Sequence, residues 1–193
     1  MFKFPAFTFN GLALAFALTT TAMVPAMLPT AAQAGATDRA KLDIDSKAAL
    51  DKLFADNPTA QVIARHAKGV LIFPSIVKAG LGVGGAFGEG EGRQNGGVEG
   101  YYNSVSGSVG LQAGVQSYGY AVFLMSDKAV QYLHDSDGWE IGVGPTVVVV
   151  DEGVARNLST TTLKDDAYAF VFDQKGLMAG VSLEGTKVTK IKP

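Results

Sequence analysis

The sequence predicts an α+β fold, in which a curved, glycine-rich antiparallel β-sheet has two or three short helices packed on it. Apolar residues recur at helical spacing in short stretches, the first of them at residues 46–67. From residue 70 onward, continuous apolar runs and period-two alternation replace that spacing, which is typical of strands. Glycine concentrates in the middle of the chain, because 14 of the 24 glycines lie between Gly80 and Gly119.

Composition narrows the class of protein before any motif is considered. The chain has 193 residues, of which 47% are hydrophobic and 18% are charged, so it can bury a core and is unlike a disordered tail. Its formal charge of −2 excludes a globally basic nucleic-acid-binding protein. The absence of cysteine excludes a disulfide framework, a thiol nucleophile and a zinc–thiolate site.

The first 34 residues are typical of a secretory signal peptide. Lys3 is their only charge, residues 11–28 are largely apolar, and Ala32-Gln33-Ala34 is the small-x-small pattern that signal peptidase accepts. Threonines and Pro25 interrupt the apolar stretch, which argues against a retained transmembrane anchor. We therefore expect residues 1–34 to be cleaved and the protein to be exported to the periplasm or cell envelope. Secretion from the cell is the alternative destination.

The mature chain is predicted to form a single domain after a flexible N-terminus. Residues 35–45 are polar and charge-mixed and form the flexible part, whereas residues 46–193 form the domain. Ser46 can cap a short helix that extends to Ala55. Asn57-Pro58 then ends this helix and begins a second one, because Asn is a good N-cap and Pro suits the first helical position.

The glycine-rich region predicts strands with one bare face. Six glycines between Gly80 and Gly92 share one parity along the chain, so one face of a pleated strand is nearly bare backbone. Such a face lets another backbone or an aromatic ring approach closely. Asn95-Gly96 predicts a type I′ hairpin turn. Beyond it, alternation indicates a half-buried strand with one side small or polar and one side apolar. The apolar side consists of Val105, Val109, Leu111 and Val115.

The remaining elements are predicted from apolar runs and turn residues. Residues 70–73 and 120–125 are fully apolar and predict strands, and Ser126 begins a third short helix. Residues 141–150 predict another strand and residues 153–166 a loop. The closing segments 167–172, 177–183 and 187–191 predict a three-stranded meander.

Motifs for catalysis, cofactors and metals are weak. Gly80-x-Gly82-x-x-Gly85 matches a dinucleotide fingerprint, but no helical pattern follows that could receive a pyrophosphate. His134-Asp135-Ser136 places triad residue types side by side, whereas real triads join distant residues. We therefore expect no enzyme activity, no catalytic residue, no metal site, no cofactor and no bound nucleotide. A weak calcium site at the acidic pairs Asp151-Glu152 or Asp165-Asp166 stays open.

Basic residues near the start of the domain are the candidates for a binding function. Arg65, Lys68 and Lys78 lie in a stretch without acids, whereas the lysines of the first helix alternate with aspartates. On a membrane, the apolar residues of that helix would insert shallowly while the cations meet anionic head groups; the same apolar residues could instead pack on the sheet. The candidate lipid-binding residues are Lys47, Lys52, Arg65, Lys68, Lys78, Leu50, Leu53 and Phe54.

Several stretches, taken in order, resemble the SYLF domain family. They are Ala67-Lys68-Gly69-Val70-Leu71-Ile72-Phe73, Lys78-Ala79-Gly80, the following glycines, and Gly176-Leu177-Met178-Ala179-Gly180-Val181-Ser182-Leu183-Glu184-Gly185. The resemblance implies a lipid-binding module without known catalysis. In eukaryotic members it implies phosphoinositide binding through an N-terminal amphipathic helix and basic residues, with actin binding in some. Bacterial members are typically exported proteins of the cell envelope.

We therefore expect a non-catalytic module of the bacterial cell envelope. Its expected partner is the surface of an anionic phospholipid membrane, with a protein partner as a second candidate and no nucleic acid. Three alternatives remain. The first is a small outer-membrane β-barrel, which the length and the alternation fit, and the second is an envelope structural protein that binds another protein. The third is an enzyme whose site assembles from distant residues.

Overall fold

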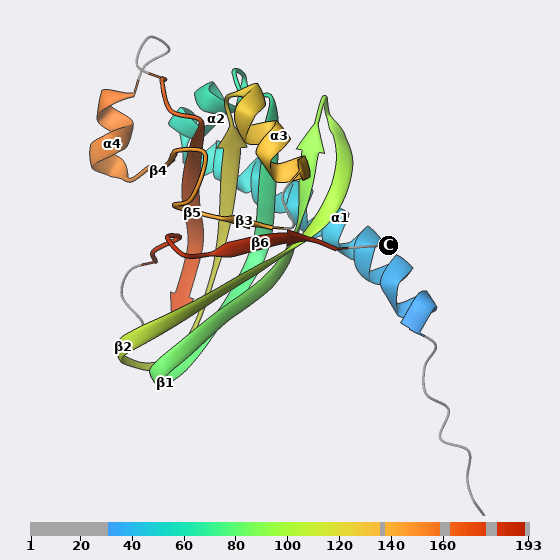
Figure 1. The fold of residues 1–193 in the computed structure, drawn as a ribbon, viewed down its shortest axis with the longest axis vertical. Coiled ribbons are helices and arrows are strands. Elements are labelled where there is room, and N and C mark those ends of the chain that lie inside the picture. Colours follow the sequence, from blue (N-terminus) through green and yellow to red (C-terminus); the bar gives the residue numbers. More distant parts are fainter. Residues whose placement is uncertain (1–30, 136–137, 159–162, 177–180, 192–193) are drawn as a thin grey trace, which may run out of the picture.

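The computed structural model describes residues 31–135, 138–158, 163–176 and 181–191 (Figure 1). The predicted signal peptide lies outside them except for its last four residues. The described chain is a curled β-sheet with helices packed on it, which confirms the predicted α+β class. Its elements are α1 (Ala31–Asp56), α2 (Pro58–Ala64), β1 (Gly69–Gln94), β2 (Gly97–Leu124), α3 (Asp127–Asp135), β3 (Trp139–Glu140), β4 (Val147–Val149), α4 (Glu152–Asn157), β5 (Ala167–Gly176) and β6 (Lys187–Lys190).

Helix α1 begins well before the predicted boundary. It includes residues 35–45, which we expected to be flexible, and Ser46 is a buried residue inside the helix rather than its cap. Lys47 pairs with Asp51 one turn later, with 2.6 Å between Nζ and Oδ2. The Tyr101 hydroxyl of β2 donates to Asp43 Oδ1 over 3.0 Å. The boundary was wrong because ion pairs and a contact 58 residues away, not apolar spacing, stabilise this part of the helix.

The starts of α2 and α3 follow their predicted caps. Asn57 Oδ1 accepts a hydrogen bond from the Ala60 amide over 3.1 Å, and Pro58 occupies the first helical position. Ser126 Oγ accepts from the Ala129 amide over 3.1 Å in the same way. These caps satisfy amide groups that have no partner within their own helix.

Strands β1 and β2 form one long antiparallel hairpin. They contain 26 and 28 residues, against about 5–6 in an ordinary strand. The turn between them is Asn95–Gly96, in which both residues have positive φ (50° and 81°), as the predicted type I′ turn requires. The sheet order is β3-β6-β2-β5-β4, with β1 paired to β2 outside this path.

The hairpin folds back on itself, and the bare glycine face makes this possible. A Cβ on Gly90 would lie 2.3 Å from the Ile72 carbonyl oxygen, and one on Gly80 would lie 2.6 Å from Gly84 Cα. The two halves of β1 therefore touch backbone to backbone, which confirms the predicted close approach. Gly82, with φ of 74°, lies at the register shift between Leu81 and Val83, where the strand turns back. Figure 1 shows both strands reversing at the end opposite the helices α2 and α3.

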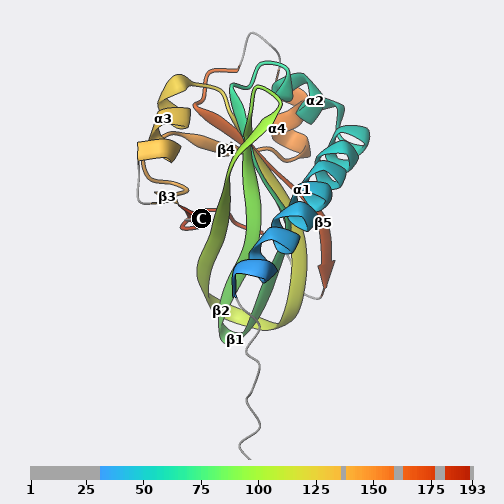
Figure 2. The same ribbon diagram turned by 90° about the vertical axis from the view of Figure 1, so that its right-hand side faces the viewer.

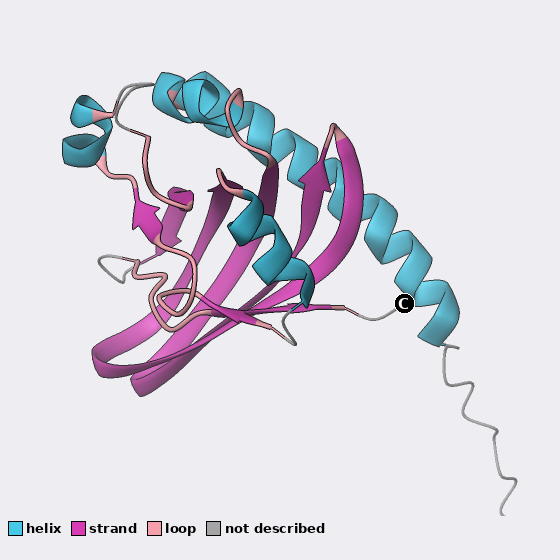
Figure 3. Cartoon of the chain, turned by 45° about the horizontal axis from the view of Figure 1, so that its top comes forward, coloured by secondary structure: helices cyan, strands magenta, loops and turns pink. Residues whose placement is uncertain are grey.

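Two hydrophobic clusters lie on the two faces of the sheet. Phe73, Tyr120 and Trp139 belong to the cluster inside the curl, which α3 closes. Ile63, Phe123 and other residues form the second cluster, between the sheet and the helices α1, α2 and α4. Figures 2 and 3 show this arrangement, with α1 running along one side of the curled sheet and α3 on the other.

The C-terminal elements differ most from the prediction. Only Val147–Val149 of the predicted strand 141–150 is a strand, and helix α4 occupies part of the predicted loop. Strand β4 runs parallel to β5, and β6 pairs with β2 and β3, so the predicted meander is wrong. Of the predicted strand 177–183, residues 177–180 lie outside the described part and residues 181–183 are not a strand. These pairings join segments distant in sequence, which local patterns do not encode.

Candidate functional site

The apolar residues predicted to enter a membrane from the first helix pack on the protein instead. Leu53 is buried, and Leu50 and Phe54 are half-buried against the same cluster. The Phe54 ring stacks on Phe123 of β2 with 6.2 Å between the ring centroids. In this structure Leu53 is therefore not available to lipid, because the sheet already covers it.

Several of the predicted basic residues already have acidic partners. Besides the pair of Lys47 with Asp51, Lys52 binds Asp173 and lies 3.3 Å from Asp56, and Lys68 binds Asp127. The hydrogen bonds of Lys52 to these acids raise its pKa. Arg65 donates to the Gln61 side chain over 3.5 Å. Local ion pairs leave little net positive charge along α1.

A different surface carries most of the large exposed apolar side chains of the described residues. We call residues 77–87 of β1 and 105–117 of β2 the distal ribbon. Leu81 and Val109 are 84% and 85% exposed at its end. The side facing outward consists of Val77, Ala79, Leu81, Val83, Phe87, Val105, Val109, Ala113 and Val115. The alternation predicted around residues 105–115 is therefore present, but Val105, Val109 and Val115 face outward. The side chain of Leu111, the fourth predicted apolar residue, lies outside the described part.

The inward side of the distal ribbon explains this reversal. Gly84 and Gly88 lie there, and Ser104 and Gln116 are buried. Near the reversal only small side chains fit between the two halves of the folded hairpin, as the close contact of Gly80 with Gly84 shows. Because successive side chains of a strand point to opposite faces, the apolar residues between them must point outward.

Lysines stand on both sides of the distal ribbon. Lys175 of β5 lies in the cross-strand row of Val77 and Ser117, and Lys187 of β6 lies in the row of Val105 and Phe87. Neither lysine forms an ion pair with another residue in the described ranges.

The predicted Lys78 is half-buried at the base of the distal ribbon and is its one charged residue. Between Glu99 and Asp127 the chain carries no charge at all. That gap is the signal by which the sequence could have identified this surface.

The comparison with known families agrees with the resemblance in the sequence. Residues 105–192 match the family model Ysc84, described as Las17-binding protein actin regulator. Residues 105–192 match the SYLF domain family. The match begins within the distal ribbon and supports a non-catalytic binding module. No curated protein matches the chain. None of the described helices is long and apolar enough to cross a membrane.

A buried carboxyl group joins α1 to the sheet. Glu91 is fully buried, and Arg93 Nη1 donates to its Oε1 over 2.9 Å. Its Oε2 has no donor among the described residues, and the carboxyl group beside it is that of Asp43. Burial, followed by the contact with Asp43, raises the pKa of Glu91 to about 7. The Arg39 guanidinium lies over the Tyr101 ring at 5.3 Å and completes the contact.

The acidic pairs considered for calcium have structural roles. Asp151 Oδ1 caps α4 by accepting from the Val154 amide over 2.7 Å. Asp166 accepts from the Ser126 hydroxyl, Lys128 and the Thr146 amide, and these bonds lower its pKa. Within the described ranges, no three His, Asp or Glu side chains come close enough to hold a metal ion.

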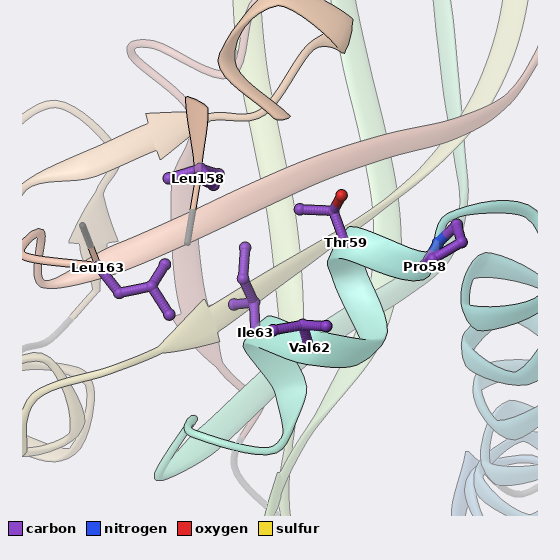
Figure 4. A pocket seen from close by; sticks show the side chains of 6 residues that line it. All are labelled: Pro58, Thr59, Val62, Ile63, Leu158 and Leu163. Atoms are coloured by element: carbon purple, nitrogen blue, oxygen red, sulfur yellow. The ribbon is translucent and has the colours of Figure 1, made fainter. Parts of the chain in front are cut away.

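Two hollows lie beside α2. One, of about 160 Å³, is lined by Pro58, Thr59, Val62, Ile63, Leu158 and Leu163 (Figure 4). It contains no titratable side chain, so it offers no acid–base chemistry. The other is a groove of about 280 Å³ between α1, the end of α2 and the tip of the hairpin. It brings together three of the predicted residues, Leu50, Phe54 and Lys68.

Proposed function

We propose that this protein is a non-catalytic module of the bacterial cell envelope that binds anionic phospholipid membranes. The observation that carries the proposal is the outward apolar side of the distal ribbon. Val83 opposite Val109 and Phe87 opposite Val105 are exposed cross-strand pairs at one end of the molecule. The SYLF match supports a binding module, and the predicted signal peptide supports the envelope location.

The shape of the distal ribbon suits partial insertion into a bilayer. It is a wedge with apolar side chains on both outer sides, because the hairpin folds back with its glycine face inside. Each side extends four residues from its lysine row to Leu81 or Val83, roughly 13 Å at the rise of a strand. Transfer of apolar surface out of water is favourable by about 25 cal/mol per Å². The backbone groups that pair between β1 and β2 can leave water, whereas the groups on the outer edges of the ribbon need water or head groups, so the expected insertion is shallow.

The lysines set the preference for anionic lipid. Lys175 and Lys187 flank the wedge on opposite sides, at the level where head groups would lie. Each contributes on the order of 1 kcal/mol near an anionic surface, and salt weakens this attraction. This proposal moves the apolar contact from α1 to the distal ribbon.

A protein partner is the other candidate, and the size of the surface argues against it. A stable protein interface uses roughly 20–30 residues on each side. The outward side of the distal ribbon offers far fewer, divided between two opposite sides of a wedge. A bilayer, in contrast, contacts both sides of an inserted wedge at once.

Vesicle co-sedimentation tests the proposal. The exported protein, with its N-terminus determined by mass spectrometry, is mixed with zwitterionic vesicles and with vesicles containing phosphatidylglycerol, at low and high salt. We expect binding to the anionic vesicles that high salt weakens. The double variant Leu81→Gln and Val109→Gln should lose most of this binding.

The control is Ile44→Gln, which removes another exposed apolar residue, 69% exposed on α1. It should bind as the unchanged protein does. If it weakens binding as much as the double variant, or if the double variant binds normally, the distal ribbon is not the membrane contact. Circular dichroism confirms that each variant is folded.

A further inference from the structure

The groove between α1, the end of α2 and the tip of the β1–β2 hairpin has an apolar floor made by elements far apart in the sequence. Leu50 and Phe54 come from α1, Ala64 from α2, and Val70 and Phe123 from the sheet. All except the buried Phe123 are half-buried, so one side of each is covered by the protein and the other faces the groove.

The entrance of the groove is cationic. Lys68 and Arg93 line it together with the polar hairpin tip, and no described acidic residue is among the lining. The pair of Lys68 with Asp127 is exposed, and exposed pairs contribute little and exchange readily. Arg93 is held by the buried Glu91, whose raised pKa of about 7 leaves the arginine charge partly uncompensated at neutral pH.

We propose that this groove binds a single-chain anionic amphiphile, with its acyl chain on the Leu50–Phe54–Phe123 floor and its head group at Lys68 and Arg93. The volume of about 280 Å³ is near the lower end of the usual range for small-molecule sites, about 300–1,000 Å³. It fits one chain rather than two and is too small for a helix of another protein. The pairing of apolar floor and cationic entrance matches the two ends of such a molecule.

This inference does not rest on the proposed membrane contact. The groove lies beside the Asn95–Gly96 turn, whereas the distal ribbon is at the other end of the hairpin (Figure 1). The two sites cannot contact one flat membrane together. The groove is therefore suited to an amphiphile that is taken up singly, either a free fatty acid or a lysophospholipid.

Isothermal titration calorimetry of the exported protein tests the groove. The probes are dodecanoate, lysophosphatidylglycerol with a twelve-carbon chain, dodecanol and dodecyltrimethylammonium, each below its micelle concentration or, for dodecanol, below its solubility limit. We expect one molecule of dodecanoate or of the lysolipid per chain, and the tighter of the two identifies the source of the ligand. The uncharged and cationic probes should bind at least about tenfold more weakly, because they lose the charged hydrogen bonds.

Two matched pairs of variants locate the site. Lys68→Gln should weaken dodecanoate binding about tenfold, whereas Lys47→Gln, which removes a lysine from another exposed ion pair, should not. Ala64→Leu narrows the groove and should abolish binding, whereas Ala55→Leu lies outside it on α1.

The double variant Leu81→Gln and Val109→Gln should bind dodecanoate normally, which separates this site from the membrane contact. The inference is overturned if dodecanoate does not bind. It is also overturned if binding is indifferent to charge, or if Lys68→Gln and Ala64→Leu both bind as the unchanged protein does. If Ala64→Leu fails to fold, Lys68→Gln and the comparison of anionic, uncharged and cationic probes still test the inference.

Discussion

Val83 and Val109 face each other across the distal ribbon with 68% and 85% of their surfaces exposed. A cross-strand pair of valines ordinarily stabilises a sheet from its buried side. Here that side is taken by Gly84 and Ser108, since the folded hairpin leaves no room for larger groups. Because the inward face accepts only small residues here, the apolar residues of these strands are exposed on the opposite face.

Charge reversal at the lysines beside the distal ribbon should weaken membrane binding. We expect Lys175→Glu combined with Lys187→Glu to reduce binding to phosphatidylglycerol vesicles by more than tenfold at low salt, because two attractions of about 1 kcal/mol become repulsions. Co-sedimentation at low and high salt measures this, and the difference should shrink at high salt. Lys47→Glu is the comparison on α1. An equal loss with that variant would return the contact to the helix.

Substitution by alanine should affect the free energy of unfolding differently at two glycines of the hairpin. Gly90→Ala should lower the free energy of unfolding by about 1–3 kcal/mol or more, because the new methyl group meets the Ile72 carbonyl oxygen at 2.3 Å. Gly107→Ala has open space around it and should be neutral or stabilising by less than about 1 kcal/mol. Urea unfolding of both variants measures the difference. Equal effects would mean that the halves of β1 do not touch.

The buried Glu91 should make stability fall as pH rises toward neutrality. Its pKa is about 7 in the folded protein and near 4.5 when unfolded, so the folded state binds more protons between these values. The favourable contribution is complete below pH 4.5 and is lost as pH rises through about 7. The loss is on the order of a few kcal/mol.

Urea unfolding between pH 5 and 8 measures this dependence. Glu91→Gln keeps a neutral group beside Asp43 and should remove the pH-dependent loss. Glu89→Gln, at an exposed position two residues away, should leave the loss unchanged. A stability that rises with pH from 5 to 7 in the unchanged protein, and equally in Glu91→Gln, would contradict the buried-acid assignment.

We expect the protein to be exported and its mature chain to begin at Gly35. Intact-mass measurement of the protein from the periplasmic fraction should give a chain of residues 35–193. Ala34→Arg is expected to block this cleavage, since signal peptidase requires a small residue there, whereas Ala31→Arg leaves the pattern intact. Recovery of a chain that still begins at Met1 would exclude the predicted processing.

The helix caps, the hairpin turn and the bare glycine face could be predicted from the local sequence. Asn57, Pro58 and the pair Asn95–Gly96 act as predicted because their effects extend over three or four residues. The shared parity of the glycines likewise predicted a close approach of backbone or an aromatic ring, and Gly90 lies against both the Ile72 carbonyl and the Phe73 ring. Period alone, however, does not say which side of a strand is buried, so the exposure of Val109 was not predictable from it.

The candidate site depended on contacts that no local pattern contains. The first half of α1 is held partly by Tyr101, and the groove is completed by Arg93 and Phe123, all distant from it in sequence. Lys187 reaches the distal ribbon only because β6 pairs with β2. Of the eight predicted binding residues, Leu50, Phe54 and Lys68 meet in the groove and Lys78 lies at the ribbon base, whereas Lys47 and Lys52 are in ion pairs elsewhere.

The long hairpin also implies an order of events as the chain folds. Its pairings begin at Asn95–Gly96, where few residues separate the partners, and each further pair closes a slightly longer loop, up to Gly69 with Leu124. If pairing extends stepwise from this turn, the residues that come into contact early are close in sequence, which favours fast formation of the hairpin. The strand can then bend at Gly82 after the residues on both sides of it have paired with β2. Replacing Gly96 by a residue that resists positive φ should therefore slow folding more than it speeds unfolding.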